Sequence, residues 1–328
     1  MRLTRFVLMG AVSLVVACGP TVEQDGEEGD LPLGDDVDIK ADGWGSALKC
    51  KPIPTRPKLT APRIVISVDG LTLHLTDQPS GLSKVYPVGV GAINHAKGEL
   101  TYDKSLTLYP PLATGKQDFT IRTAETEPCK VWWTDPATRQ KSPVFAGLPF
   151  LRWYGAYGIH GPITGYTAPN GGQLQRGYVS HGCVRMEAAD VAELWAYVRQ
   201  VATVPVRVQK AVERDSSGLA VDVPQRWVLS ECRADADCNF AGGVCLPRTT
   251  PGVGFCTARC SALCSYDKYG YPITFCVSDG KTPAQGYCTY KSSDFNDTCR
   301  RYGGFRAEPG VSRFSQPAVK ANVCLPEP

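Results

Sequence analysis

The stretch Ser180-His181-Gly182-Cys183-Val184-Arg185-Met186 decides how this chain is interpreted, together with the pair His160-Gly161 that lies upstream of it. His160 comes 23 residues before Cys183. A cysteine attacks a carbonyl group as the thiolate, and a free thiol has a pKa of about 8.5, so an imidazole must take its proton at neutral pH. Both His160 and His181 are candidates. Gly182 has no Cβ, which allows a sharp turn that brings backbone N–H groups close to a reacting oxygen. The stretch therefore predicts a cysteine nucleophile with an oxyanion site in its own loop.

Two other interpretations of the same residues stay open. Cys183 packs in a core while both histidines bond to neighbours, or His160, His181 and Cys183 hold a zinc ion. The density of the motif favours the nucleophile, because a single cysteine beside one histidine is a much weaker signal than this two-part pattern.

The two-part pattern resembles the signature of the YkuD-like L,D-transpeptidases, in which a His-Gly pair is followed downstream by Ser/Thr-His-Gly-Cys-x-Arg/Asn. The resemblance implies that Cys183 is the nucleophile and that His160 is the general base and acid. It implies that backbone amides around His181 to Cys183 bind the oxyanion and that Arg185 faces a carboxylate of the substrate. The predicted site residues are catalytic Cys183, His160 and His181, with Gly182, Gly161, Ser180 and Arg185 for oxyanion and substrate binding.

The same resemblance sets the expected chemistry. The substrates are peptidoglycan peptide stems, and the product is a 3-3 cross-link or an attachment to another amine, including a protein lysine. With water as acceptor the enzyme is an L,D-carboxypeptidase. No metal, cofactor or nucleic acid is expected. An alternative from a different class is a non-catalytic lipoprotein that binds or anchors to peptidoglycan.

The pattern of apolar residues predicts strands before the motif and a helix after it. Two β-branched runs, at 63–68 and 71–76, flank Asp69-Gly70, which is a strong hairpin signal. Residues 84–90 make a third strand, and residues 150–159 lead into His160 as a buried strand. Apolar residues then recur at helical spacing from Val191 to Val198, and 203–208 return as a strand. We expect a mainly β, β-rich α+β domain over 61–209, which the resemblance identifies as a YkuD-like β-sandwich with a packed helix.

The N-terminal region predicts export and a lipid anchor. Arg2 and Arg5 precede a short apolar run that ends at Ala17-Cys18, so residues 1–18 resemble a lipoprotein signal peptide in which Cys18 is acylated. Residues 19–43 carry nine acidic residues and one lysine, and 19–60 are expected to form a disordered tether. The net charge of the chain is +3, to which 1–18 contribute +2 and 19–43 contribute −8, so the remainder carries 3 − 2 + 8 = +9. A basic body suits an anionic polymer. By resemblance to sorted lipoproteins, the protein faces the periplasm from the outer membrane.

The C-terminal region predicts a second, small domain. Residues 210–229 are expected to form a linker, and ten cysteines follow within 230–328. This density is typical of a disulfide scaffold in an oxidising compartment, and zinc is less favoured because the region contains no histidine. With Cys18 acylated and Cys183 expected to be free, as a nucleophile requires, only Cys50 and Cys129 remain, and whether they bridge to each other is left open. The role of this domain is left open between binding, spacing and protease resistance.

Overall fold

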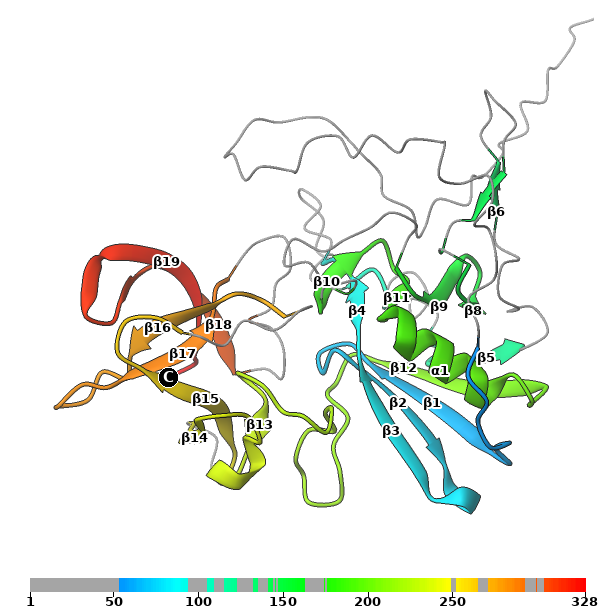
Figure 1. Ribbon diagram of the computed structural model, residues 1–328, viewed down its shortest axis with the longest axis horizontal. Coiled ribbons are helices and arrows are strands. Elements are labelled where there is room, and N and C mark those ends of the chain that lie inside the picture. The colour runs from blue at the N-terminus through cyan, green and yellow to red at the C-terminus, as the bar shows by residue number, and fades with distance from the viewer. Residues whose placement is uncertain are drawn as a thin grey trace, which may run out of the picture.

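Figure 1 shows a computed structural model of the chain. The structure describes residues 53–93, 105–108, 115–122, 132–134, 141–143, 145, 147–162, 174, 176–248, 252–264, 271–292, 299 and 304–328. The signal peptide, the acidic residues of the tether, Cys18, Cys50 and Cys129 all lie outside this set. Within it, no helix is long and apolar enough to cross a membrane.

The described elements are strands with one α-helix and two short 3-10 helices. The first part of the chain contains β1 (Pro62–Ser67), β2 (Thr72–Asp77), η2 (Gln78–Ser80), β3 (Leu82–Pro87), β4 (Gly89–Gly91), β5 (Asp118–Arg122), β6 (Trp132–Thr134), β7 (Lys141–Pro143), β8 (Phe150–Tyr154), β9 (Tyr157–His160), β10 (Gly177–Ser180), β11 (Val184–Arg185), α1 (Ala188–Val198) and β12 (Thr203–Gln209). The C-terminal part contains β13 (Glu231–Cys232), η5 (Asp235–Asp237), β14 (Gly243–Pro247), β15 (Gly254–Cys260), β16 (Thr274–Ser278), β17 (Gly286–Tyr290), β18 (Phe305–Arg313) and β19 (Gln316–Pro326). The mainly β fold class is confirmed.

A five-stranded sheet in the order β3-β2-β1-β12-β5 contains the predicted hairpin. β1 and β2 pair antiparallel, as the Asp69-Gly70 signal predicts, and β12 returns parallel to β1. Alternate residues of these strands, such as Ile64, Ile66 and Leu73, are fully buried. The two-residue period of side-chain direction thus places one face of the sheet in the core.

The third predicted strand is split between two sheets. Residues up to Pro87 belong to β3 at the edge of the first sheet, whereas β4 lies inside a second sheet in the order β10-β4-β11-β9-β8. The change of sheet occurs at Val88, whose N–H donates to the carbonyl of Leu71 at 3.1 Å. Pro87 has no N–H to continue the ladder, so the chain leaves the first sheet there. The expectation of one continuous strand over 84–90 was wrong for this reason.

Helix α1 follows β11 and packs its apolar side into the core that the two sheets share. Its buried residues include the four that define the sequence periodicity, Val191, Leu194, Trp195 and Val198. In Figure 1 the helix lies between the strands of the first sheet and those around β9 and β11. The predicted helix is confirmed.

Residues 210–229, predicted as a linker, connect the two parts of the chain but are packed rather than solvated. The hydroxyl of Ser67 donates to the carbonyl of Ala211 at 3.0 Å and accepts from the N–H of Glu213 at 3.1 Å. The carboxylate of Glu213 lies 2.9 Å from Nδ1 of His74. Further along, the N–H of Leu229 donates to the carbonyl of Cys256 at 2.8 Å. The segment is therefore bonded to the first sheet at one end and to the C-terminal strands at the other.

The C-terminal strands form the predicted disulfide-rich domain, which is coloured yellow to red in Figure 1. All ten of its cysteines pair, as Cys232–Cys245, Cys238–Cys256, Cys260–Cys276, Cys264–Cys288 and Cys299–Cys324. An aromatic core that includes Phe255, Phe275 and Tyr290 lies among them. Disulfides rather than zinc therefore hold this domain, as the sequence predicts.

Candidate active site

Two parallel strands bring the halves of the motif together. β9 ends at His160, and β11 begins directly after Cys183. In the register of the two strands, Val184 is opposite Ile159 and Arg185 is opposite His160. The N–H of Met186 donates to the carbonyl of His160 at 2.8 Å, which fixes the pairing. Residues 23 apart in sequence thus become neighbours across one strand pair.

The register also places the sulfur of Cys183. Its Sγ lies 3.3 Å from the backbone nitrogen of Gly158, whose N–H points at it. Gly158 precedes His160 by two residues, so both belong to the same face of β9, about 7 Å apart along the strand. The sulfur therefore lies beside the backbone of β9, two residues before His160.

The loop from Ser180 to Cys183 is held by its own hydrogen bonds. The hydroxyl of Ser180 accepts from the N–H of Gly182 at 3.1 Å and donates to the carbonyl of Cys183 at 2.5 Å. The carbonyl of Ser180 accepts from the N–H of Ala92 at 2.6 Å. Ser180 is buried and acts within the loop, so the structure gives it a structural role. The N–H of Gly182, predicted as an oxyanion donor, is directed at the Ser180 hydroxyl here.

Gly182 is required for two reasons. Its φ is +122°, a conformation that residues with a Cβ rarely adopt. A Cβ at this position would lie 2.0 Å from Cε1 of Tyr157. The ring of Tyr157 therefore packs where any larger side chain would be.

Gly161 is similar, because a Cβ there would lie 2.6 Å from Leu148 and 3.0 Å from Val191 of α1. Gly161 thus allows close packing behind the site.

His160 is fully buried among aromatic rings, with the ring centre of Phe145 4.3 Å from its own. Its Nδ1 lies 2.6 Å from the carbonyl oxygen of Gly161. A carbonyl only accepts, so Nδ1 carries the proton and Nε2 has the lone pair. Nε2 is buried and has no hydrogen-bond partner among the described residues. Nε2 is therefore the ring nitrogen that can accept a proton.

The surroundings of His160 keep it neutral. Burial lowers its pKa to about 3, the charge of Arg185 adds to the decrease, and the hydrogen bond to Gly161 opposes it. Arg185 is half-buried and lies opposite His160 in the register. His181 is exposed to solvent. Of the two histidines that the sequence offers as base, the structure thus buries His160 and exposes His181.

Cys183 differs from the sequence expectation. It is fully buried, and it is disulfide-bonded rather than free. The ten cysteines of the C-terminal domain pair among themselves, so its partner lies outside the described residues. The expectation of a free thiol rested on counting cysteines, and a count contains no information about which sulfur atoms approach each other. In this oxidised form Cys183 has no thiolate, so it cannot act as the nucleophile that the motif predicts.

The zinc interpretation finds no support among the residues that the structure describes. Clusters of three ligand atoms within 4.8 Å of one another occur there only at Cys232, Cys238 and Cys256 and at Cys260, Cys264 and Cys276, all of which are disulfide-bonded. His160, His181 and Cys183 do not form such a cluster.

Comparisons with known proteins agree with the fold and the motif. The family model described as the L,D-transpeptidase catalytic domain, YkuD, matches residues 62–208. These residues therefore form a YkuD-type L,D-transpeptidase catalytic domain, and the family that the motif indicates is confirmed. No curated protein matches the chain.

Solved structures of L,D-transpeptidases are also similar to the chain. That from Xylanimonas cellulosilytica is 20% identical, with 48% of this chain and 64% of that one covered and a TM-score of 0.26. That from Stackebrandtia nassauensis is 14% identical, with 48% and 58% covered and a TM-score of 0.28. L,D-transpeptidase 3 from Mycobacterium tuberculosis, solved with a faropenem-derived adduct, is 16% identical, with 46% and 60% covered and a TM-score of 0.28. The chain spans about three fifths of the length of these structures.

Proposed function

We propose that this protein is an L,D-transpeptidase that acts on peptidoglycan peptide stems through a cysteine thioester, once Cys183 is a free thiol. One observation carries the proposal: the register of β9 and β11 puts Cys183 Sγ at the N–H of Gly158, two residues before His160 on the same strand, and Nε2 of His160 is buried with no hydrogen-bond partner among the described residues. A family match over 62–208 supports the reaction class.

In the proposed reaction, Nε2 of His160 takes the proton of the Cys183 thiol, and the thiolate attacks the carbonyl of the third stem residue. The N–H of Gly158 stabilises negative charge on the sulfur. The carbon–sulfur bond forms, the bond to the terminal D-alanine breaks, and the imidazolium returns the proton to the leaving amine.

The thioester is then resolved by an acceptor. An amine of a second stem gives a 3-3 cross-link, a protein lysine gives an anchored protein, and water gives a carboxypeptidase. Arg185 is proposed to bind a carboxylate of the stem, as the resemblance implies. The basic remainder of the chain, at +9 by the sum given above, suits an anionic wall polymer.

The proposed location is the periplasmic face of the outer membrane, through a lipid on Cys18. The support is the sequence of residues 1–18 alone. Separation of membranes from soluble protein checks it, since a Cys18→Ala variant should leave the membrane fraction. A variant that stays with the membrane would contradict the anchor.

The test of activity uses a chain in which Cys183 has no cysteine to pair with. A Cys18→Ala/Cys50→Ala/Cys129→Ala protein keeps the five C-terminal disulfides and needs no reductant. Incubated with defined tetrapeptide stems, it should show by mass spectrometry an acyl-enzyme at Cys183 and release of D-alanine. The matched control adds Cys183→Ala and should show neither.

A non-catalytic wall-binding protein is the second candidate, because the disulfide at Cys183 masks the nucleophile. The same experiment separates the two. If the triple variant binds peptidoglycan but forms no adduct with any stem, the enzymatic proposal fails and the binding function is favoured.

A further inference from the structure

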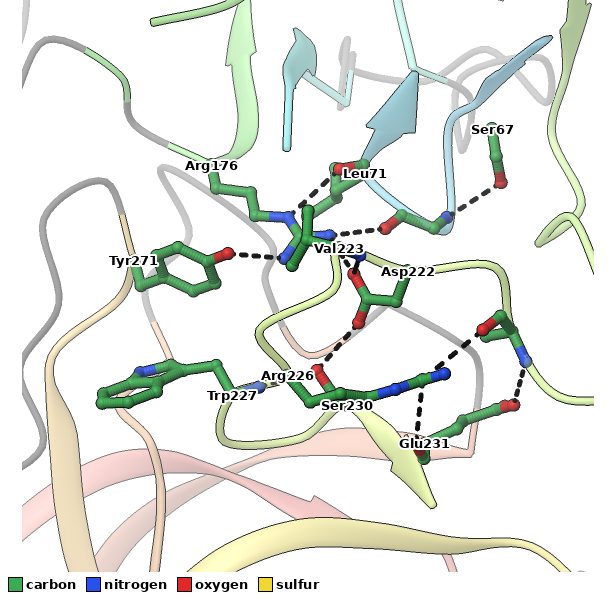
Figure 2. A network of polar contacts seen from close by, with 12 residues as sticks. Ser67, Leu71, Arg176, Asp222, Val223, Arg226, Trp227, Ser230, Glu231 and Tyr271 are labelled. Carbon is green, nitrogen blue, oxygen red and sulfur yellow. Dashed lines mark hydrogen bonds and ion pairs between the residues drawn. The ribbon is translucent and has the colours of Figure 1, made fainter. Parts of the chain in front are cut away.

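Arg176 is a buried arginine that joins three parts of the chain (Figure 2). Its side chain is 1% exposed. Nε donates to the carbonyl of Leu71 at 3.1 Å, and one terminal nitrogen donates to the carbonyl of Gly70 at 3.3 Å. The same nitrogen lies 2.8 Å from Oδ1 of Asp222, and the other donates to the hydroxyl of Tyr271 at 3.0 Å. The guanidinium thus bonds to the β1–β2 hairpin, to the connecting segment and to the C-terminal domain.

The counter-ion of Arg176 is itself held by the start of the C-terminal domain. The carboxylate of Asp222 is fully buried, and its second oxygen accepts from the hydroxyl of Ser230 at 2.8 Å. That hydroxyl in turn accepts from the N–H of Trp227 at 3.1 Å. Figure 2 shows this chain of contacts from Arg176 to Trp227. Both charges have partners on several sides, which a buried ion pair requires.

Tyr271 extends the contact into the aromatic core of the C-terminal domain. It is buried in that core, and the guanidinium of Arg176 lies 5.2 Å from its ring centre. Through these contacts the C-terminal domain supplies both a hydroxyl and an aromatic ring to one side chain of the catalytic domain.

Arg176 stands immediately before β10, the strand that leads into the nucleophile loop. Among the described strands β10 lies at the edge of its sheet and pairs with β4 alone, and its register shifts between Tyr178 and Ser180. An edge strand with an irregular register has few backbone bonds of its own to fix its position. Ser180 at its end holds both Gly182 and Cys183. Any displacement of β10 therefore moves the nucleophile.

We propose that the C-terminal disulfide-rich domain positions the nucleophile loop, with Arg176 as the positioning residue through which it acts on β10. The inference rests on the proposed function for its catalytic consequence. Its geometric part, that the docked domain holds β10 in place, is measurable without any substrate.

The test compares variants in the full chain carrying Cys18→Ala/Cys50→Ala/Cys129→Ala. Tyr271→Phe removes only the hydroxyl that the C-terminal domain gives to Arg176 and keeps the aromatic core filled. Tyr287→Phe, in the same core and outside the Arg176 network, is the matched control. Arg176→Lys keeps the charge, but a single ammonium cannot reproduce the planar fork that contacts four acceptors.

Three readouts are taken. Hydrogen exchange by mass spectrometry, with disulfides reduced after the quench, reports the protection of residues 176–184. The rate of alkylation of Cys183 by iodoacetamide, measured as a function of pH, reports the pH at which its thiol is half ionised. Exchange of the terminal D-alanine of a defined stem reports activity.

Tyr271→Phe should raise amide exchange in 176–184, leave β8, β9 and the C-terminal core unchanged, and shift the alkylation midpoint. It should lower the rate of D-alanine exchange about tenfold. This is the effect expected if the loss of one hydrogen bond to a charged group is expressed entirely in the position of the loop. Arg176→Lys should show the same pattern with larger changes. Tyr287→Phe should resemble the parent in all three readouts.

The proposal is overturned if Tyr271→Phe and Tyr287→Phe give the same protection of 176–184 and the same alkylation midpoint. It is also overturned if Arg176→Lys only lowers global stability while Tyr271→Phe has no local effect. If the parent exchanges no D-alanine yet Tyr271→Phe changes protection and alkylation, the transpeptidase proposal fails and the positioning role is supported.

Discussion

Thr107 and Gly182 lie 75 residues apart in sequence, and the hydroxyl of Thr107 donates a hydrogen bond of 2.9 Å to the carbonyl of Gly182. The same hydroxyl accepts from the N–H of Gly91 at 2.7 Å. One buried side chain therefore ties the nucleophile loop to β4, in the middle of the second sheet. Together with the bonds of Ser180, it makes the loop a part of the sheet rather than a loose connection.

Replacing Thr107 by valine tests this link. The change keeps the shape of the side chain but leaves the Gly91 N–H and the Gly182 carbonyl without this partner, which should cost about 1–3 kcal/mol of stability. Stem acylation should fall about tenfold. Thr72→Val is the matched control, because Thr72 is fully buried and its hydroxyl has no partner in the described part of the chain. Urea unfolding and acylation rates measure both effects, and equal losses in the two variants would contradict the role of Thr107.

Gly182→Ala should abolish acylation. The Cβ of the alanine would overlap Tyr157, and the alanine would have to adopt a φ of +122°. Gly81→Ala is a control for the backbone effect alone, since Gly81 has a φ of +71° and open space around it. Gly81→Ala should lower the free energy of unfolding by about 1–2 kcal/mol and leave the acylation rate unchanged. Acylation by Gly182→Ala at the wild-type rate would show that the loop has another conformation in solution.

His160→Gln should lower acylation by about 10²–10⁴-fold, because it removes the proposed base. It should also change the pH dependence of stability. Burial lowers the pKa of His160 to about 3 from the 6.5 of an ordinary imidazole. Between these values the unfolded chain binds a proton that the folded chain does not, so stability decreases as pH falls.

Relative to His160→Gln, the protein with His160 should lose about 2 kcal/mol of unfolding free energy between pH 7.5 and pH 5. Urea unfolding at the two pH values measures this difference. Parallel pH profiles for the two proteins would mean that His160 is exposed to water in the folded state.

The disulfide at Cys183 predicts that the protein is inactive as isolated under oxidising conditions. Acylation should be absent in the unreduced wild type and present in the triple variant that lacks Cys18, Cys50 and Cys129. Peptide mapping without reduction should identify the partner of Cys183. Unreduced wild type that acylates as fast as the triple variant would show that Cys183 is free in solution.

Features coded by local patterns were predictable from sequence. The Asp69-Gly70 hairpin, the helix with its period from Val191 to Val198 and the disulfide character of the C-terminal domain all follow from short-range signals. The motif likewise located His160 and the Cys183 loop, because the family signature is dense. The match of the family model to 62–208 confirms the family that the motif indicates.

Features set by contacts between distant residues were not predictable. No pattern around Thr107 marks it as a partner of Gly182, and none around Tyr157 shows that its ring fills the space beside that glycine. The change of sheet at Val88 depends on a carbonyl in the preceding hairpin. The prediction that Cys183 is free was wrong for the same reason, because a count of cysteines does not say which sulfur atoms lie close together.

The ion pair of Arg176 has a consequence for how the chain is made. Synthesis proceeds from the N terminus, so Arg176 emerges 46 residues before Asp222 and 95 residues before Tyr271. A chain that ended near residue 208, where the family match ends, would contain neither Asp222 nor Tyr271. The arginine therefore gains its counter-ion and its aromatic neighbour only after residues beyond the family match have been made.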